Sequence, residues 1–133
     1  MKRLVALLAA LLILVLSGCG KVSNTMEITC DTSQIYSTAD IYDAMEVVEK
    51  YFWREFDGCT LTALGYAGDE KRAAMESWAA QYGAREAIVL VSSFETGKNT
   101  NGALNANDTY RNYQWVLVRG SNGAWEHKTH GYG

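Results

Sequence analysis

Histidine and cysteine, the side chains best suited to metal binding or nucleophilic catalysis, are scarce here: the chain of 133 residues has two His and three Cys. His127 and His130 stand three residues apart near the end of the sequence. Residues three apart on a strand point to opposite faces, so this pair is not expected to converge on a metal ion. So few Cys and His also exclude multi-cysteine zinc modules. The sequence therefore predicts no metal site and no cofactor.

A polar stretch, residues 96–108, holds side chains with the oxygen atoms that calcium takes as ligands: Asn99, Asn101, Asn105, Asn107 and Asp108. Only one of these side chains is a carboxylate. The spacing also matches no EF-hand loop, which needs several carboxylates and a final Glu. A solvated loop is therefore the better interpretation of this stretch.

Three carboxylates in predicted strands could serve as a general acid or base: Glu86, Glu95 and Glu126. Carboxylates are mostly exposed, and two of these stand near strand ends, so surface positions are the default expectation. The sequence has no Gly-Xaa-Ser-Xaa-Gly elbow and no Gly-rich phosphate loop. Cys59 has no His with a clear claim to activate it. We predict no catalytic residue.

Aromatic residues are the unusual feature of the composition, with 3 Phe, 4 Trp and 8 Tyr. One set is expected to fill the core of a small domain: Phe52, Phe56, Trp78, Trp115 and Trp125. Exposed tyrosines favour the recognition of partners or ligands. The candidate ligand or partner surface consists of Tyr66, Tyr110, Tyr113 and Tyr132.

Two helices are predicted to position these side chains. The longer one starts at Ser37, which can cap it, and ends at Gly58, which can take the left-handed conformation. Its apolar stripe recurs every three or four residues: Ile41, Met45, Val48, Phe52 and Phe56. A shorter helix over residues 70–82 is expected to begin after a cap at Asp69.

Four strands are predicted over residues 59–66, 85–94, 110–119 and 124–130, and residues 26–30 form a short strand or an ordered lead-in. The second strand is apolar on both faces at its centre, which indicates a central strand covered on both sides. Asn122-Gly123 predicts a tight hairpin between the last two strands. The predicted fold class is α+β, with an antiparallel sheet of about four strands wrapped around the long N-terminal helix.

The first 18 residues have the pattern of an export signal. Lys2 and Arg3 precede an apolar run over residues 4–16, which is shorter than the roughly 20 residues that span a bilayer. Leu16-Ser17-Gly18-Cys19 follows directly. This pattern resembles the lipobox of bacterial lipoproteins, and the resemblance implies cleavage before Cys19 and lipidation of its thiol. It also implies a protein anchored at the extracytoplasmic face of a cell membrane. Residues 20–25 are polar and are expected to form a short flexible tether.

Two further cysteines, Cys30 and Cys59, would lie outside the reducing cytoplasm, where a disulfide can persist. A bridge would close a loop of about 29 residues and stabilise the fold by about 3.6 kcal/mol on the chain-entropy model. The alternative is that both are small buried residues. The sequence leaves both readings open, because it does not show whether their Cβ atoms meet.

A second resemblance rests on the opening helix over residues 41–56, the segment Asp57-Gly58-Cys59-Thr60-Leu61, and the ending. That ending is a strand over residues 114–119, a turn with Asn122-Gly123, a strand entered by Trp125, and the close Gly131-Tyr132-Gly133. In these features the chain resembles small lipoproteins of unknown function in the cystatin-like/NTF2-like superfamily. The resemblance implies a sheet rolled around the helix. It implies no catalytic residue, because this superfamily hosts enzymes, binding proteins and assembly modules.

The expected organisation is a signal peptide (residues 1–18), a lipid anchor and tether (19–36) and one α+β domain (37–133). Ten of the 12 basic residues and all 15 acidic residues follow the leader, a net charge of about −5 that argues against nucleic-acid binding.

We expect a non-catalytic binding module whose partner, beyond the membrane itself, is an envelope protein or a small molecule. The alternative is a small enzyme or small-molecule-binding protein with a pocket between the first helix and the sheet. That alternative requires a cavity with an inward-facing carboxylate or His, and a solid aromatic interior would contradict it.

Overall fold

The computed structural model describes residues 20–100 and 103–132. The predicted leader, the predicted lipidation site Cys19 and the loop residue Asn101 lie outside these residues. The described chain is an α+β fold with these elements in order: β1 (Gly20–Thr29), α2 (Thr38–Glu55), β2 (Cys59–Tyr66), the 3-10 turn η1 (Asp69–Lys71), α3 (Arg72–Gln81), β3 (Glu86–Thr96), β4 (Thr109–Arg119) and β5 (Glu126–Gly131). The predicted α+β class is confirmed. The two helices and the four later strands lie within a few residues of their predicted bounds, whereas β1 begins six residues before the short strand predicted over residues 26–30.

The sheet is mixed and has five strands in the order β1-β2-β3-β4-β5. β2 to β5 pair antiparallel, as predicted, but β1 pairs parallel to β2. The prediction of a purely antiparallel sheet of about four strands is therefore wrong. The cause is the connection: α2 carries the chain back along the sheet between β1 and β2, which leaves those two strands parallel. Residues 20–25, predicted as a flexible tether, are part of β1.

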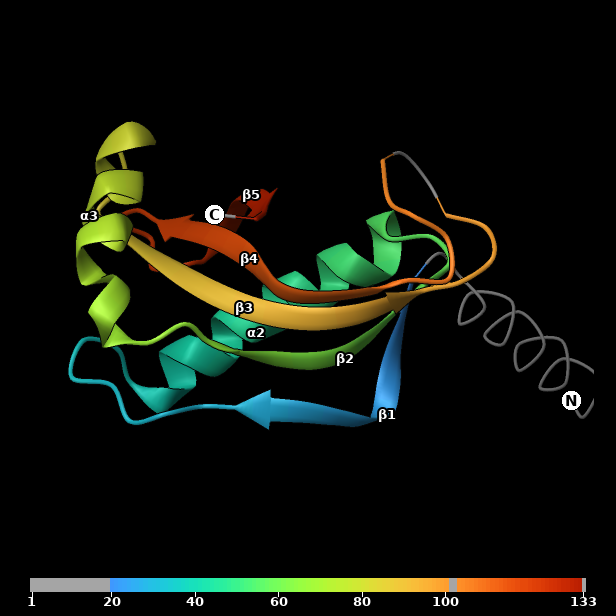
Figure 1. Ribbon diagram of the computed structural model, residues 1–133. Coiled ribbons are helices and arrows are strands. Elements are labelled where there is room, and N and C mark those ends of the chain that lie inside the picture. The colour runs from blue at the N-terminus through green and yellow to red at the C-terminus, as the bar shows by residue number, and fades with distance from the viewer. Residues whose placement is uncertain (1–19, 101–102, 133) are drawn as a thin grey trace, which may run out of the picture.

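Helix α2 lies across one face of the curved sheet, and its two ends reach the two ends of the strands (Figure 1). Its N-cap is Ser37, whose hydroxyl accepts a hydrogen bond from the Asp40 N–H at 3.1 Å, as the sequence predicted. The predicted apolar stripe is buried along its whole length. The helix ends at Glu55, and Gly58 follows with a φ of +74°.

Strand β3 is the central strand of the sheet, and four consecutive apolar residues in it, 87–90, are buried. This confirms the prediction of a strand covered on both faces. Helix α3 packs against β3 near one end of the sheet. Asp69 does not cap this helix, contrary to prediction: its carboxylate accepts hydrogen bonds from the Ser33 hydroxyl, the Gln34 N–H and the Tyr66 hydroxyl. It ties the loop before α2 to the end of β2.

Irregularities in strand pairing decide which side chains face α2. In β5, His127 pairs with Leu117 and Thr129 pairs with Val116, so Lys128 is an extra residue. In β4, Tyr113 stands three positions after Tyr110, whereas their partners in β3, Ser92 and Phe94, are only two positions apart. Asn112, within this bulge, has a φ of +56°. Such bulges shift the alternation of side chains by one residue. Residues three apart across a bulge therefore share a face.

The two cysteines described, Cys30 and Cys59, are free thiols, the first half-buried and the second buried. Gly20 pairs with Cys59 and Thr29 pairs with Gly65, so the cysteines lie near opposite ends of β2. At about 3.3 Å per residue this separation is roughly 20 Å, while a disulfide needs Cα atoms within about 7 Å. The candidate disulfide is therefore contradicted, and the buried-residue reading fits Cys59. Within the described ranges, no helix has the length and apolar character needed to cross a bilayer.

Candidate functional site

The bulge at Lys128 brings the two histidines together. His130 Nδ1 and His127 Nε2 lie 3.2 Å apart, within hydrogen-bonding distance. The prediction that they point to opposite faces is wrong, because it assumed an unbroken strand. Both rings face α2, where the centroid of the Tyr51 ring lies 4.2 Å from that of His127 and 5.5 Å from that of His130.

Aromatic surroundings keep this histidine pair neutral. The rings of Phe56 and Trp115 lie 5.3 and 5.0 Å from the ring of His130. Burial, with a smaller contribution from the neighbouring His130, lowers the pKa of His127 to about 4. Burial also lowers the pKa of His130. At neutral pH the pair therefore contributes hydrogen-bonding atoms and no charge.

A pocket of about 360 Å³ opens beside this pair, where α2 ends. Its size is at the low end of the range of small-molecule sites. The walls come from the end of α2, from β4 and β5, and from the loop between β3 and β4. The lining residues are Tyr51, Glu55, Phe56, Asp57, Ala103, Leu104, Tyr113 and His130.

Negative charge dominates this pocket. Glu55 and Asp57 are exposed, and neither forms an ion pair with any residue that the structure describes. No Lys or Arg belongs to the described lining. The last carbonyl groups of α2 add to this field, because the C-terminal end of a helix carries partial negative charge. The pocket is thus suited to a positively charged group.

Two tyrosine hydroxyl groups add hydrogen-bonding capacity. Among the described residues, the hydroxyls of Tyr51 and Tyr113 have no hydrogen-bond partner, yet no buried side-chain oxygen or nitrogen lacks one. Neither hydroxyl is thus engaged by the part of the chain that the structure describes. Since both residues line the pocket, their hydroxyls are available to a ligand there. Tyr113 is otherwise buried, and desolvation raises its pKa.

Three of the four tyrosines predicted as a recognition surface come together here. The ring centroid of Tyr110 lies 6.3 Å from that of Tyr113 and 6.2 Å from that of Tyr132, which is 63% exposed. The bulge at Asn112 makes this possible. Tyr66 is separate: it is buried at the far end of β2, where its hydroxyl donates to Asp69.

The space between α2 and the sheet is solid. Phe52, Phe56 and Trp115 of the predicted core aromatics fill it, and Trp115 donates its indole N–H to the Ser92 hydroxyl at 2.7 Å. Trp78, also predicted as core, is only partly buried on α3, where it stacks on Tyr82. Phe52 stacks on Phe56, and both contact Phe94. The expectation of an enclosed pocket between the first helix and the sheet is therefore not met along the helix. The hollow lies only at its C-terminal end.

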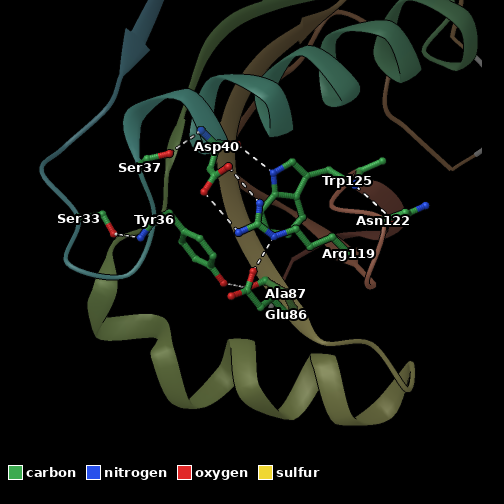
Figure 2. A network of polar contacts seen from close by, with 10 residues as sticks. Ser33, Tyr36, Ser37, Asp40, Glu86, Ala87, Arg119, Asn122 and Trp125 are labelled. Atoms are coloured by element: carbon green, nitrogen blue, oxygen red, sulfur yellow. Dashed lines mark hydrogen bonds and ion pairs between the residues drawn. The ribbon is translucent and has the colours of Figure 1, made fainter.

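At the opposite end of α2, Arg119 forms the centre of a polar network (Figure 2). Its guanidinium lies 3.0 and 3.3 Å from the two Asp40 oxygens and also donates to Glu86. The indole ring of Trp125 covers it at 4.4 Å, and the indole N–H donates to the Asp40 carbonyl at 2.9 Å. We call these four residues the arginine clamp. The guanidinium lowers the pKa of Asp40 mainly through its hydrogen bonds.

The remaining candidates contribute less. Glu86 belongs to the clamp, and Glu126 pairs with Lys128 at 3.2 Å. Glu95, at the end of β3, is exposed. Burial raises the pKa of the Cys59 thiol, which keeps it protonated and poorly nucleophilic.

The polar loop before β4 is organised by the Thr96 side chain, whose hydroxyl accepts from the Asp108 N–H at 2.8 Å. Within residues 20–100 and 103–132, no group of three or more metal-binding side chains occurs.

Sequence reasoning missed most of the pocket: Tyr51, Glu55, Phe56 as a lining residue, Asp57 and His130. One signal was available. Two carboxylates close to the end of a helix oppose the helix dipole, and such local conflicts often mark functional sites.

Known proteins offer no guide to this pocket. No protein-family model, no curated protein and no solved structure matches the chain. The candidate site therefore stands on its geometry alone: a negatively charged pocket with aromatic walls, free hydroxyls and a neutral histidine pair.

Proposed function

We propose that this chain is a lipid-anchored extracytoplasmic binding protein whose ligand site is the pocket at the C-terminal end of α2. One observation carries the proposal. The pocket gathers carboxylates, tyrosine hydroxyls and aromatic rings, but no nucleophile paired with a base and no group of metal ligands among the described residues. Such a set holds and orients a ligand without an evident bond-making step.

Cys19 is the proposed attachment point, on the strength of the basic start, the short apolar run and the Leu16-Ser17-Gly18-Cys19 pattern. Gly20, the next residue, is buried: a Cβ atom there would lie 2.3 Å from the Phe52 carbonyl oxygen. A lipid on Cys19 would therefore leave no free linker, and the end of α2 with its pocket would face the membrane surface.

The proposal includes the cystatin-like/NTF2-like roll as the fold type. It is supported by the position of α2 across one face of a sheet whose strands follow in sequence order. Helix α3, inserted between β2 and β3, departs from the plainest form of that roll. The fold type carries no function with it.

The anchor is tested by expressing the full chain in bacteria fed with a labelled fatty acid. We expect label in the mature protein, cleavage before Cys19, and recovery with membranes. Cys19→Ser should abolish both label and cleavage, whereas Cys30→Ser should change neither. Label that persists in the Cys19→Ser variant would contradict the proposal.

The binding role is tested by thermal unfolding of the full lipidated chain in a maltoside detergent, against a panel of amines, sugars, cell-wall fragments, lipids and steroids. A ligand at 100 times its dissociation constant should stabilise the fold by about 2.7 kcal/mol, a shift of several degrees. Failure of every compound to shift the transition, or an equal shift in a variant with a blocked pocket such as Leu104→Trp, would contradict the proposal.

A second function, acid–base catalysis, is favoured by the histidine pair. His130 lines the pocket and is oriented by His127, the arrangement of a base and its orienting partner. The two functions are separated by recovering the bound compound after long incubation. An unchanged compound supports binding alone, and conversion that His130→Gln abolishes supports the enzyme.

A further inference from the structure

We propose that the ligand of this pocket presents an organic ammonium cation, which the carboxylates of Glu55 and Asp57 and the rings of Tyr51, Phe56 and Tyr113 would surround. The inference rests on the proposed function and names the chemical class of its ligand.

The charge around the pocket is uncompensated. Two carboxylates line it, neither has an ion-pair partner in the part of the chain that the structure describes, and α2 directs its C-terminal carbonyls towards the same end. Lys50, one turn earlier on α2, pairs with Glu46 at 3.0 Å. Two other cations lie nearby, Arg54 in the last turn of α2 and Lys98 in the loop after β3, but neither lines the pocket or pairs with its carboxylates. An anionic ligand would be repelled by these carboxylates, and a neutral ligand would gain no electrostatic attraction from them.

The aromatic walls suit an ammonium group better than a metal ion. Phe56 and Tyr113 are largely buried, and Tyr51 is half-buried, so their rings form a desolvated wall with only a limited exposed surface. The face of an aromatic ring attracts cations, most strongly where water is excluded, and such walls recognise quaternary ammonium groups. A small divalent ion would instead require several converging oxygen or nitrogen ligands.

The arginine clamp shows this chemistry with its cation in place. There, two carboxylates and the Trp125 ring hold a guanidinium that is 12% exposed, at 4.4 Å from the ring centroid. The pocket repeats the arrangement of two carboxylates beside aromatic rings, but no Lys or Arg among the described residues supplies the cation. A ligand that brings its own positive charge would complete it.

Two sources can supply an ammonium group: a soluble amine such as choline, or the head group of a membrane lipid. Both fit a pocket of about 360 Å³, and the burial of Gly20 beside the end of α2 would bring the site close to a bilayer anchored through Cys19. The experiment therefore needs one arm for each source.

The probes are tetramethylammonium and choline, with 3,3-dimethylbutanol as an uncharged compound of the same shape as choline. Binding to the full lipidated chain in maltoside detergent is measured by calorimetry and by shifts of the tyrosine signals in NMR spectra. We expect choline to bind at least tenfold more tightly than dimethylbutanol. To distinguish the two sources, nanodiscs of phosphatidylcholine are tested as competitors of choline, with nanodiscs of phosphatidylglycerol, which lack an ammonium group, as the control.

Three variants identify the groups responsible. Glu55→Gln should weaken choline binding about fivefold to tenfold and leave dimethylbutanol binding unchanged, because Glu55 is exposed and the fold does not depend on it. Asp43→Asn removes an exposed charge from the same helix far from the pocket, and should change neither. Tyr51→Phe should keep most of the affinity and Tyr51→Leu should lose about fivefold, since only the former keeps the ring.

The outcomes are distinct. If an uncharged compound binds in this pocket and no ammonium compound does, the inference is overturned while the proposed function stands. If choline binds equally to the wild type and to Glu55→Gln and Tyr51→Leu, the inference is again overturned. If nothing binds, both fail. Competition by phosphatidylcholine nanodiscs assigns the head group as the source, and choline binding without that competition assigns a soluble amine.

Discussion

Both ends of α2 place two carboxylates beside aromatic rings, but only the N-terminal end also has a described cation between them. At its N-terminal end, Arg119 lies between the carboxylates of Asp40 and Glu86 and beneath the ring of Trp125, and every charge has a partner (Figure 2). At its C-terminal end, Glu55 and Asp57 stand beside aromatic rings without a described cation. A saturated network holds α2, β3 and β4 together. The carboxylates at the other end have no described ion-pair partner and are, on our proposal, available to a ligand.

The two ends also differ in the free energy needed to remove their charged groups from water. Arg119 is mostly buried, so its partners must compensate the loss of water around it. The carboxylates of the pocket remain exposed to water and cost little while unpaired. The clamp is thus expected to contribute mainly to stability, and the pocket, on our proposal, to ligand binding.

The largest effect is expected at the clamp. Arg119→Met leaves Asp40 and Glu86 facing each other without a cation, and should destabilise the fold by about 2–4 kcal/mol. Arg119→Lys keeps the charge but loses the fork geometry and much of the stacking on Trp125, and should cost about 1–2 kcal/mol. Urea unfolding followed by circular dichroism gives both values. A fully stable Arg119→Met protein would contradict a structural role for the clamp.

Gly58 lies at the end of α2 against the loop after β3, where its carbonyl accepts a hydrogen bond from the Gly97 N–H at 2.8 Å. A substitution here tests the pocket end of the helix. Its φ of +74° favours glycine, and a Cβ atom would lie 1.9 Å from the Asn99 carbonyl oxygen. Gly58→Ala should therefore cost about 2 kcal/mol and displace the loop that forms one wall of the pocket. Gly123→Ala, at another positive φ but with open space around it, is the matched control for backbone strain alone.

The elements were predictable from sequence, and the site was not, for one physical reason. Spacing located α2, β2 and β3 because burial of an apolar stripe or strand is repeated along the whole element. A bulge is a single local event, and the extra residue at Lys128 leaves no periodic trace. That one residue decides whether His127 and His130 meet.

The remaining errors have a similar origin in tertiary contacts. Residues 20–25 are polar and carry little strand signal, yet β1 forms because β2 offers it an edge with which to pair. Asp69 has the sequence context of a helix cap, but its carboxylate instead accepts hydrogen bonds from Ser33, Gln34 and Tyr66. The local preference of an Asp for capping a helix is overridden where several hydrogen bonds from other segments converge on its carboxylate.

Acid should weaken the pocket end before the clamp end. The pKa of His127 is about 4 when folded and about 6.5 when unfolded, so its contribution is complete above pH 6.5 and is lost as the pH falls towards 4. Because the ring is not fully buried, we expect a loss of about 1–2 kcal/mol. Asp40 has a lowered pKa, so the clamp carboxylate is protonated only below its ordinary pKa of 3.8.

Urea unfolding at pH 7, 6, 5 and 4.5 measures this loss, and the control is His127→Phe, which keeps an aromatic ring and removes the proton site. The variant should show a flatter profile between pH 6.5 and 4.5 than the wild type. Identical profiles for the two proteins would mean that the histidine pair does not titrate as its burial requires.

The smallest effect gives the sharpest test of the division between the two ends. A carboxylate in the last turn of a helix opposes the helix dipole, so Glu55→Gln should stabilise the fold by about 0.3–0.5 kcal/mol at low salt. The gain should disappear at about 1 M salt, where charges are screened beyond about 3 Å. Asp43→Asn, in the interior of the same helix, should change stability by about zero.

If the charge of Glu55 stabilised the fold, its removal could not increase the stability of the protein. A gain in stability together with a loss of affinity for a cation would therefore mark Glu55 as kept for binding, while a loss of stability would assign it to the fold alongside Asp40.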